Sequence, residues 1–496
     1  MSLKTILGVI FASLGVTTKP DVNFFTELFE LLFSIQGRVN FWNLSRYSTY
    51  NESTFRRRFA QFFDWLNFNC LVTESAQVGA TGQVIGVIDC SFISKSGKKT
   101  FGLDTYWSGC AAKSKRGLEI SVLGVIDVVS GTAWTLDVTQ TPAHLATKEA
   151  QVEVTPQDKA KAKPKIASAA KKAEAKMQLA AQKAEAKMQL AAQKAEAKMQ
   201  SVAQKAEAKM QLAAKKVEAK LKAEAKKAEA KLKEVGKTKE EAEGKTQTGL
   251  YTRIDFYFEQ IVDCLPKLLT IKYFVADGFY AKYKMIHGLL SVGKHLITKL
   301  RPDANLMFKF EASQEKRQGP PNKYEGKAVY NDLSKWHFIG KDAKYDYLNV
   351  YHRICYSPQF GVWLSVALVL NTKTNQYILL ASTDSEQSAL DILTFYQLRF
   401  QIEFLFRDAK QFTGLTHCQA RDEAKLDFHF NLSLAAINVI QLLKINDPSI
   451  TSMNALTRKA YNTKIVKYLL DQLSLNAEFD LSNPLINNVI NFGTVF

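Results

Sequence analysis

Two apolar runs that lie far apart in the chain both end in an aspartate, and this pairing constrains the fold more than any other feature. The runs are Val84-Ile-Gly-Val-Ile-Asp89 and Ile271-Lys-Tyr-Phe-Val-Ala-Asp277. Apolar, β-branched runs of this length are typical of buried central strands. A carboxylate on such a strand is costly unless something binds it. We therefore predict an α/β fold in which the two strands are neighbours in one sheet and bring Asp89 and Asp277 together.

Other strands and helices are predicted around this pair. The turn Ser130-Gly131 separates two strand patterns, 117–129 and 132–141, and predicts a meander with the first run. We predict the following organisation: a helical N-terminal domain at 1–78, a core in three parts at 79–143, 248–301 and 382–445, a long helical insertion at 144–247, a β-rich insertion at 302–381, and a helical C-terminal region at 446–496.

A helix late in the core carries a third carboxylate. Thr383 and Glu386 form a possible capping box upstream of it. At about 100° per residue, Tyr396, Arg399, Glu403 and Lys410 fall within roughly 60° of one another around the helix. A carboxylate flanked by cations can hold a divalent metal beside a phosphate. The alternative is a solvated face with ion pairs inside the helix.

The spacing of these four residues is specific. Two residues separate Tyr396 from Arg399, three separate Arg399 from Glu403, and six separate Glu403 from Lys410. This spacing resembles the Y-(2)-R-(3)-E-(6)-K signature of the insertion-sequence-four (YREK) family of DDE transposases. The resemblance extends over residues 80–142 and 247–430. It implies an RNase H-like catalytic core, a mixed sheet with flanking helices.

The same resemblance implies the chemistry. Asp89, Asp277 and Glu403 would be the catalytic triad and would hold two Mg²⁺ or Mn²⁺ ions, while Tyr396, Arg399 and Lys410 would contact DNA. The implied activity is DNA transposition and recombination of an insertion sequence, through phosphodiester hydrolysis and strand transfer at terminal inverted repeats. The family also implies a tryptophan in the β-rich insertion that stacks on a flipped base, with Trp336 and Trp363 as candidates.

Two basic segments are further candidates for DNA contacts. Residues 38–58 predict a short helix, a polar turn and a capped helix with Arg56, Arg57 and Arg58 in its first turns. This pattern fits a helix-turn-helix on DNA and equally an ordinary helical hairpin. Three cations, Lys113, Lys115 and Arg116, are predicted to lie in a loop that either touches phosphates or is merely solvated.

The net charge of +18 favours a polyanionic partner, nucleic acid before membrane. However, residues 168–235 hold 17 lysines and 8 glutamates, so 17 − 8 = +9, half of the total, comes from one segment. There an 11-residue unit recurs from Lys172, Lys183, Lys194 and Lys205. Its period predicts a helical rod of roughly 100 Å, or a helical pair, with at most weak coiled-coil association. We favour a tolerated expansion over a functional element.

Six cysteines without a Cys-x-x-Cys pair predict neither a zinc ribbon nor a disulfide framework. We expect a cytoplasmic, nucleoid-associated protein without a membrane partner. The longest apolar run after the N-terminal segment, Phe360 to Leu370, is too short to span a bilayer. A homodimer is expected, because two DNA ends must be brought together. The competing hypotheses are a catalytically inactive, transposase-derived DNA-binding protein, a self-assembling helical rod with a vestigial core, and a plain RNase H-like nuclease.

Overall fold

The computed structural model describes residues 3–16, 18–80, 82–97, 99–143, 145, 251–311, 322–472 and 484–490. The chain divides into two compact units, Met1–Leu145 with Tyr251–Phe496, and Ala146–Leu250. The predicted helical repeat lies outside the described residues, so the following account concerns the first unit.

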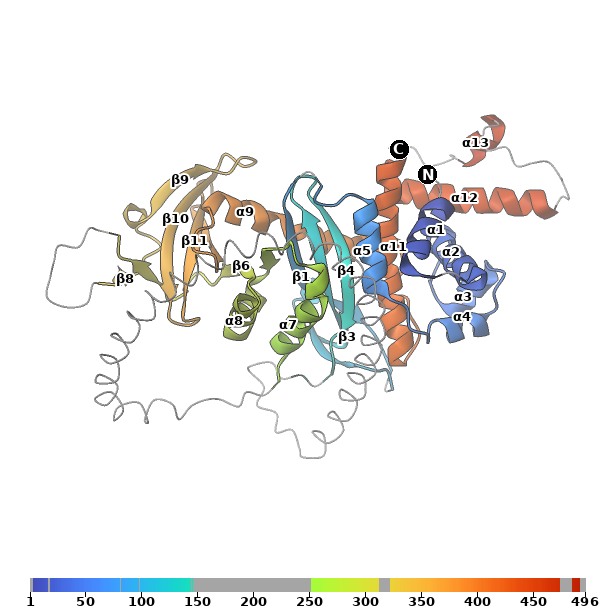
Figure 1. The fold of residues 1–496 in the computed structure, drawn as a ribbon, viewed down its shortest axis with the longest axis horizontal. Helices are drawn as coiled ribbons and strands as arrows, with labels where there is room; N and C mark the ends of the chain where they lie inside the picture. Colours follow the sequence, from blue (N-terminus) through green and yellow to red (C-terminus); the bar gives the residue numbers. More distant parts are fainter. Residues whose placement is uncertain are drawn as a thin grey trace, which may run out of the picture. The chain divides into compact units, whose positions relative to one another are not determined.

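One mixed sheet organises this unit (Figure 1). Its strands run in the order β2-β3-β1-β5-β6-β12-β11-β10-β7-β8, with β4 beside β3 and β9 beside β10. The strands are β1 (Val84–Ser94), β2 (Asp104–Ser108), β3 (Lys113–Asp127), β4 (Thr132–Gln140), β5 (Tyr273–Ala276), β6 (His295–Leu300), β7 (Met307–Lys309), β8 (Tyr324–Lys327), β9 (His337–Lys341), β10 (Leu348–Ser357), β11 (Val362–Asn371) and β12 (Gln376–Ser382).

The centre of the sheet has the arrangement that the two aspartate runs predicted. β4, β3 and β1 form an antiparallel meander, and β5 and β6 continue beside β1 in parallel. This combination of parallel and antiparallel strands, with helices around it, confirms the predicted α/β class with a mixed sheet.

The strands predicted as a β-rich insertion extend this same sheet. β12 pairs antiparallel with β6 through four residue pairs, from Leu379↔Leu300 to Ser382↔Ile297. β11 and β10 then follow in antiparallel order. Because the backbone groups at the edge of β6 are paired with β12, the segment is continuous with the core sheet.

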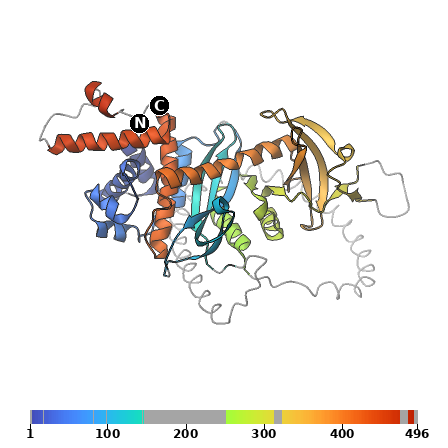
Figure 2. The same cartoon turned by 180° about the vertical axis from the view of Figure 1, so that it is seen from behind.

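Some of the described helices cover the two faces of the sheet, and others pack together beyond it at the N-terminal end of the chain. The described helices are α1 (Leu3–Leu14), α2 (Lys19–Ser34), α3 (Phe41–Arg46), α4 (Glu52–Arg58), α5 (Trp65–Ser75), α7 (Arg253–Cys264), α8 (Tyr283–Ser291), α9 (Ala389–Leu398), α10 (Phe400–Phe412), α11 (Glu423–Asn446), α12 (Met453–Gln472) and α13 (Pro484–Ile490). Figure 1 shows α7 and α8 in front of the sheet, whereas the reverse view in Figure 2 shows the orange α9–α10 segment crossing its other face.

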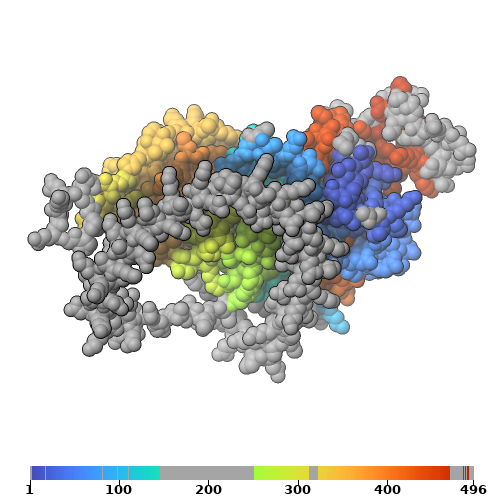
Figure 3. All heavy atoms as spheres, in the orientation of Figure 1, coloured from blue at the N-terminus to red at the C-terminus, as the bar shows by residue number. Residues whose placement is uncertain are grey.

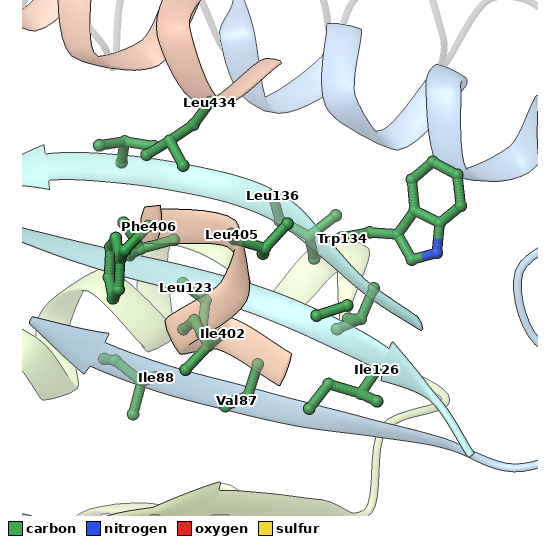
Figure 4. Packing of buried hydrophobic residues seen from close by; sticks show 14 of the residues in the cluster. Val87, Ile88, Leu123, Ile126, Trp134, Leu136, Ile402, Leu405, Phe406 and Leu434 are labelled. Atoms are coloured by element: carbon green, nitrogen blue, oxygen red, sulfur yellow. The ribbon is translucent and has the colours of Figure 1, made fainter. Parts of the chain in front are cut away.

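The helix α10 lies across the central strands because its apolar side is buried there. Figure 4 shows Ile402, Leu405 and Phe406 of α10 among Val87 and Ile88 of β1, with Leu123 of β3 close by. Burial of apolar surface stabilises a fold by about 25 cal/mol per Å² removed from water. The apolar side chains of α10 therefore fix where the helix crosses the sheet. This packing thereby sets the position of the polar residues on the opposite side of α10.

The N-terminal helices share a core with α11. The ring of Phe428 in α11 is surrounded by three aromatic rings. Its centroid lies 6.2 Å from that of Phe25, 4.4 Å from that of Phe59 and 5.1 Å from that of Trp65. α12 packs against α2, and the space-filling view shows its red atoms adjoining the blue N-terminal helices (Figure 3). Of the described helices, α11 alone is long and apolar enough to cross a membrane, and 83% of its most apolar window is buried inside the protein.

Local details differ from the sequence prediction at the late helix. It begins at Ala389, where the Ser388 hydroxyl caps the Asp391 amide at 3.1 Å. Thr383, predicted as the cap, instead accepts from the Leu296 amide at 3.0 Å and joins the sheet. The helix is also divided at Arg399, because the Arg399 amide bonds to the Tyr396 carbonyl three residues back, a tighter turn than the α-helical bond.

Candidate active site

Asp89 on β1 and Asp277, which directly follows β5, occupy corresponding positions along two adjacent parallel strands. The register pairs Gly86 with Phe274 and Val87 with Val275, an offset of 188 residues, and the same offset relates Asp89 to Asp277. Asp89 was predicted to end its strand, but β1 continues to Ser94 because its pairing with β3 extends to Gly117. The carboxyl group therefore lies along a paired strand, and its side chain is 18% exposed.

The Asp277 carboxyl group is held by the turn that follows β5. The turn η3 (Gly278–Tyr280) begins after Asp277, whose Oδ1 accepts from the Phe279 amide at 2.8 Å. The Asp277 carbonyl accepts from the Thr298 hydroxyl on β6 at 2.8 Å. Gly278 permits this close turn, since a Cβ there would lie 3.0 Å from the Lys299 carbonyl oxygen. Two strands and a turn thus fix this aspartate.

Arg399 joins the third carboxylate to the first. Its Nη1 lies 3.3 Å from Asp89 Oδ2, and its Nη2 donates to Glu403 Oε1 at 2.8 Å. The Arg399 side chain is 8% exposed, whereas that of Glu403 is 45% exposed. One buried guanidinium group therefore connects the β1 carboxylate with the carboxylate on α10. Its Nε is also buried and has no hydrogen-bond partner among the described residues.

Burial and a second acid act together on Asp89. Desolvation raises its pKa most, the nearby Asp277 carboxylate raises it further, and Arg399 only partly opposes them, so the pKa is about 7. The charged form of Asp89 is thus costly in the folded protein. A carboxyl group whose ionisation is suppressed by burial and by a neighbouring acid is typical of a site that receives a cation or a proton.

Comparison with known protein families agrees with this arrangement. Residues 26–344, more than half of the chain, match the DDE superfamily endonuclease model. The chain belongs to the DDE superfamily of endonucleases. Residues 256–439 also match the transposase DDE domain, which implies nuclease or transposase activity and an RNase H-like core. No curated protein matches the chain.

Use of a divalent metal is expected of a DDE endonuclease, and two of the three predicted carboxylates suit such an ion. Asp89 and Asp277 fit, since they are adjacent carboxylates whose mutual repulsion a cation would relieve. Glu403 instead forms an ion pair with Arg399. Within the described ranges, no group of three or more His, Cys, Asp and Glu side chains is placed to hold one ion. The three-carboxylate metal site therefore stays a prediction.

Two more residues of the signature lie on the same helical segment. The Arg399 guanidinium stands 5.7 Å from the Tyr396 ring centroid. Burial raises the pKa of the Tyr396 phenol, and Asp277 acts in the same direction while Arg399 opposes it, so this side chain lies in the field of both site residues. Lys410 follows Glu403 by seven residues, about 10 Å along α10.

The predicted DNA contacts of this DDE endonuclease occupy two other places. Arg56, Arg57 and Arg58 were predicted in the first turns of their helix, but they form the last turn of α4, which starts at Glu52 under an Asn51 cap. Arg56 pairs with Glu52 and Arg58 with Asp21, each at 2.5 Å.

The second basic segment is a strand and not the predicted loop. Lys113, Lys115 and Arg116 are exposed and open β3, paired with Ser108, Tyr106 and Thr105 of β2. The hairpin holds Lys113 and Lys115 on one side and Arg116 on the other, because side chains alternate along a strand.

The two tryptophan candidates differ in accessibility. Trp336 is 4% exposed, donates from Nε1 to the Val329 carbonyl at 3.0 Å, and packs its ring against Phe308. Trp363 is partly exposed on β11, with Tyr356 and Tyr324 at 5.3 Å and 5.8 Å between ring centroids. Only Trp363 retains ring surface that a base could meet.

Sequence reasoning missed a set of buried polar residues behind the aspartates. The Cys90 thiol and the Tyr280 hydroxyl lie 3.1 Å apart and so connect the residue after Asp89 with the turn after Asp277. On the neighbouring strand, Glu119 accepts from the Tyr257 hydroxyl at 2.7 Å. Burial raises the pKa of Cys90 well above its usual range, so the thiol stays protonated. The sequence signal that could have identified these residues is their position, since Cys90 follows Asp89 by one residue and Tyr280 follows Asp277 by three.

Proposed function

We propose that this DDE endonuclease is the transposase of an insertion sequence, of the insertion-sequence-four kind, that cuts the ends of its element and joins them to target DNA. The observation that carries the proposal is the alignment of Asp89 with Asp277 on parallel strands, with Arg399 linking Asp89 to Glu403. The Tyr396, Arg399, Glu403 and Lys410 spacing on the same segment supports the narrower family.

Asp89 and Asp277 would hold Mg²⁺ or Mn²⁺, with Glu403 as the third ligand of a two-ion site. Bound ions of this kind supply Lewis acidity and lower the pKa of an attacking water or hydroxyl. Because Asp89 has a pKa of about 7 without metal, it must lose a proton at neutral pH to act as a ligand. Arg399 would keep Glu403 near Asp89 through its two ion pairs.

The proposed reaction has two steps. Water attacks the phosphorus at the element end, a P–O bond forms, and the 3′-oxygen leaves and takes up a proton. The freed 3′-hydroxyl then loses its proton and attacks a phosphorus in the target, and the target's own 3′-oxygen leaves and takes up a proton as the new P–O bond forms. Tyr396 and Lys410 would hold the DNA end beside the carboxylates, and Trp363 would stack on a displaced base.

The proposed partners are double-stranded terminal repeats and target DNA. Two groups of basic residues would contact phosphates. One lies on the β2–β3 hairpin and consists of Lys113, Lys115 and Arg116, and the other lies on α4 and consists of Arg56, Arg57 and Arg58. We place the protein in the cytoplasm at the nucleoid, and we expect two copies to hold the two DNA ends.

The test uses a plasmid that carries the DNA flanking the gene on both sides. The full-length protein should nick this DNA in Mg²⁺ and yield joined strand-transfer products. Asp277→Asn should lower nicking roughly 100-fold or more, the scale on which one preorganised electrostatic group acts. The asparagine keeps an oxygen for the Phe279 amide, so the turn should persist.

Asp303→Asn is the matched control, since this aspartate is 72% exposed and pairs with Arg301. Nicking that survives Asp277→Asn would refute the proposed active site. Nicking without any joined product would reduce the protein to a nuclease. A folded protein that binds DNA but never cuts it would support the inactive-descendant hypothesis.

A further inference from the structure

A basic groove lies beside the far ends of the two elements that carry Asp89 and Glu403. It consists of two adjoining cavities of about 790 and 490 Å³ that share Val39 and His417. The Val39 amide donates to His417 Nδ1 at 3.2 Å between them. We call this feature the α3–α10 groove, because it is bounded by α3, α4 and the segment 416–421 on one side and by the end of α10 and α12 on the other.

The charge of the groove is strongly one-sided. Among the described residues, five cations and one carboxylate line it: Arg38, Arg56, Lys95, Arg421, Arg458 and Glu52. Glu52 is already paired with Arg56. No described carboxylate pairs with Arg38, Arg421 or Arg458, and all three are exposed. The groove therefore presents uncompensated positive charge to the solvent.

The groove also contains a buried hydroxyl without a partner. Thr100 is 8% exposed, lines the larger cavity, and its Oγ1 makes no hydrogen bond to a described residue. A buried polar group without a partner usually marks a site for water or a ligand. Thr100 lines the same cavity as Lys95 and adds a neutral donor to the cations.

Both site elements lead from the carboxylates to this groove. β1 passes from Asp89 to Ser94, and Lys95 follows in the groove lining. On α10, Glu403, Arg407 and Gln411 are all exposed at intervals of four residues, and Gln411 lines the smaller cavity. Residues four apart lie on one side of a helix. An exposed track that carries Arg407 thus connects the active site with the groove.

The distance along these elements suits a DNA arm. Eight residues of helix from Glu403 to Gln411 span about 12 Å, and six residues of strand from Asp89 to Lys95 span about 20 Å. Successive base pairs are about 3.4 Å apart, so these spans correspond to roughly four to six base pairs.

We propose that the α3–α10 groove binds the phosphate backbone of the DNA arm about four to six base pairs from the cleaved bond. This inference rests on the proposed function for the nature of the substrate. Arg38 and Arg421 fit phosphates because they are exposed and can neutralise them without losing an ion pair to any described carboxylate. The groove would set where the duplex enters, and the carboxylates where it is cut.

Salt dependence of binding tests the groove independently of cleavage. The probe is a fluorescent 30-base-pair duplex of random sequence, titrated with full-length protein by anisotropy at several salt concentrations. Arg38→Ala with Arg421→Ala should lower the slope of log affinity against log salt by about two, one for each lost phosphate contact. Arg38→Lys with Arg421→Lys keeps both charges and should preserve the slope.

The control is Arg301→Ala with Lys373→Ala, which removes the same charge from two exposed positions outside the groove. An equal fall in slope for this control, or no fall for the groove variant, would overturn the inference. If the groove variant alone loses slope while the wild type never nicks DNA, the groove stands and the proposed function fails. If the wild type nicks DNA and the slope is unchanged in the groove variant, only the groove fails.

Neutral methylphosphonate linkages locate the contact. Placed one at a time in a duplex of the element end, they should weaken wild-type binding four to six positions from the mapped nick and have no such effect on the Arg38→Ala, Arg421→Ala variant. Sensitivity confined to other positions, or the absence of any nick, would refute the proposed spacing.

Discussion

At the residue scale, the informative group is the Asp89 carboxyl, because the fold disfavours its charge and yet retains it. Its ordinary pKa is 3.8 and its folded pKa is about 7, for reasons of burial first and Asp277 second. Between these values the folded chain holds a proton that the unfolded chain has lost. Stability therefore falls as pH rises across this window and stays lower above it. Such a cost is typical of sites kept for function.

We therefore predict that Asp89→Asn stabilises the metal-free protein at pH 8, by about 1–3 kcal/mol, while it abolishes nicking. At about pH 2.5 the two proteins should melt nearly alike, because Asp89 is then neutral in the folded state and almost entirely neutral in the unfolded state. Thermal melting in EDTA across this pH range measures the difference. Added Mg²⁺ should raise the melting temperature of the wild type alone, since the variant lacks a ligand.

Asp384 provides a control of opposite sign. Burial raises its pKa, but hydrogen bonds from Lys272 and Tyr273 outweigh burial and lower it to about 2. Its stabilising effect is present above pH 3.8 and is lost as pH falls toward 2. Asp384→Asn should therefore lower the melting temperature at pH 8. A fall for Asp89→Asn as well would contradict the assignment of Asp89 as a destabilising charge.

At the element scale, the turn η3 positions one carboxylate through backbone contact. Asp277 precedes Gly278, and β6 lies so close that no Cβ fits without displacement of the turn or of the Lys299 carbonyl. A shift of about 1 Å in a catalytic group can cost on the order of 100-fold in rate. The glycine is thus a positioning residue, although it touches no substrate.

We predict that Gly278→Ala lowers Mg²⁺-dependent nicking about 10- to 100-fold and raises the Mg²⁺ concentration needed for half-maximal rate, with only about 1 kcal/mol lost in stability. Rate as a function of Mg²⁺, together with thermal melting, measures both effects. Gly109→Ala serves as control, since a Cβ there meets nothing within 4 Å. Unchanged metal dependence in Gly278→Ala would show that the turn does not position Asp277.

At the scale of the whole molecule, the described strands form one continuous sheet, and all of them lie outside the repeat. β4 ends at Gln140 and α7 begins at Arg253, and the pairing of β1 with β3 and β5 involves only residues on either side of the repeat. A long segment between two paired elements adds only a slowly growing loop-closure cost. The charge of the repeat, +9 by sequence, is a separate contribution.

We predict that deletion of residues 150–245 leaves nicking within about threefold of the wild type, because no described contact of the site depends on them. Non-specific DNA affinity should fall and its salt dependence should weaken, because many lysines are lost. Nicking and anisotropy assays on the same preparations separate the two effects. A Gly/Ser linker of equal length provides the control for chain length, and loss of nicking in both variants would assign the repeat a function.

Much of the fold followed from local pattern. The strand ending at Ala276 and the strand that begins at Thr132, after the Ser130-Gly131 turn, match the predictions, since each is bounded by turn residues and has a clear pattern. The prediction was wrong where a tertiary contact competes with a local signal. Thr383 had the sequence of a helix cap, but its hydroxyl bonds to the Leu296 amide of β6.

The sequence by itself determined that two buried strands carry aspartates and that a late helix carries the aromatic, cationic and acidic series, because burial and periodicity are written in residue type and spacing. Only the tertiary structure decided that β1 and β5 run parallel and in which register, that Arg399 spans Asp89 and Glu403, and that β12 joins the insertion to β6. Strand direction, register and side-chain partners are set by packing between segments far apart in the chain, and no local pattern records them.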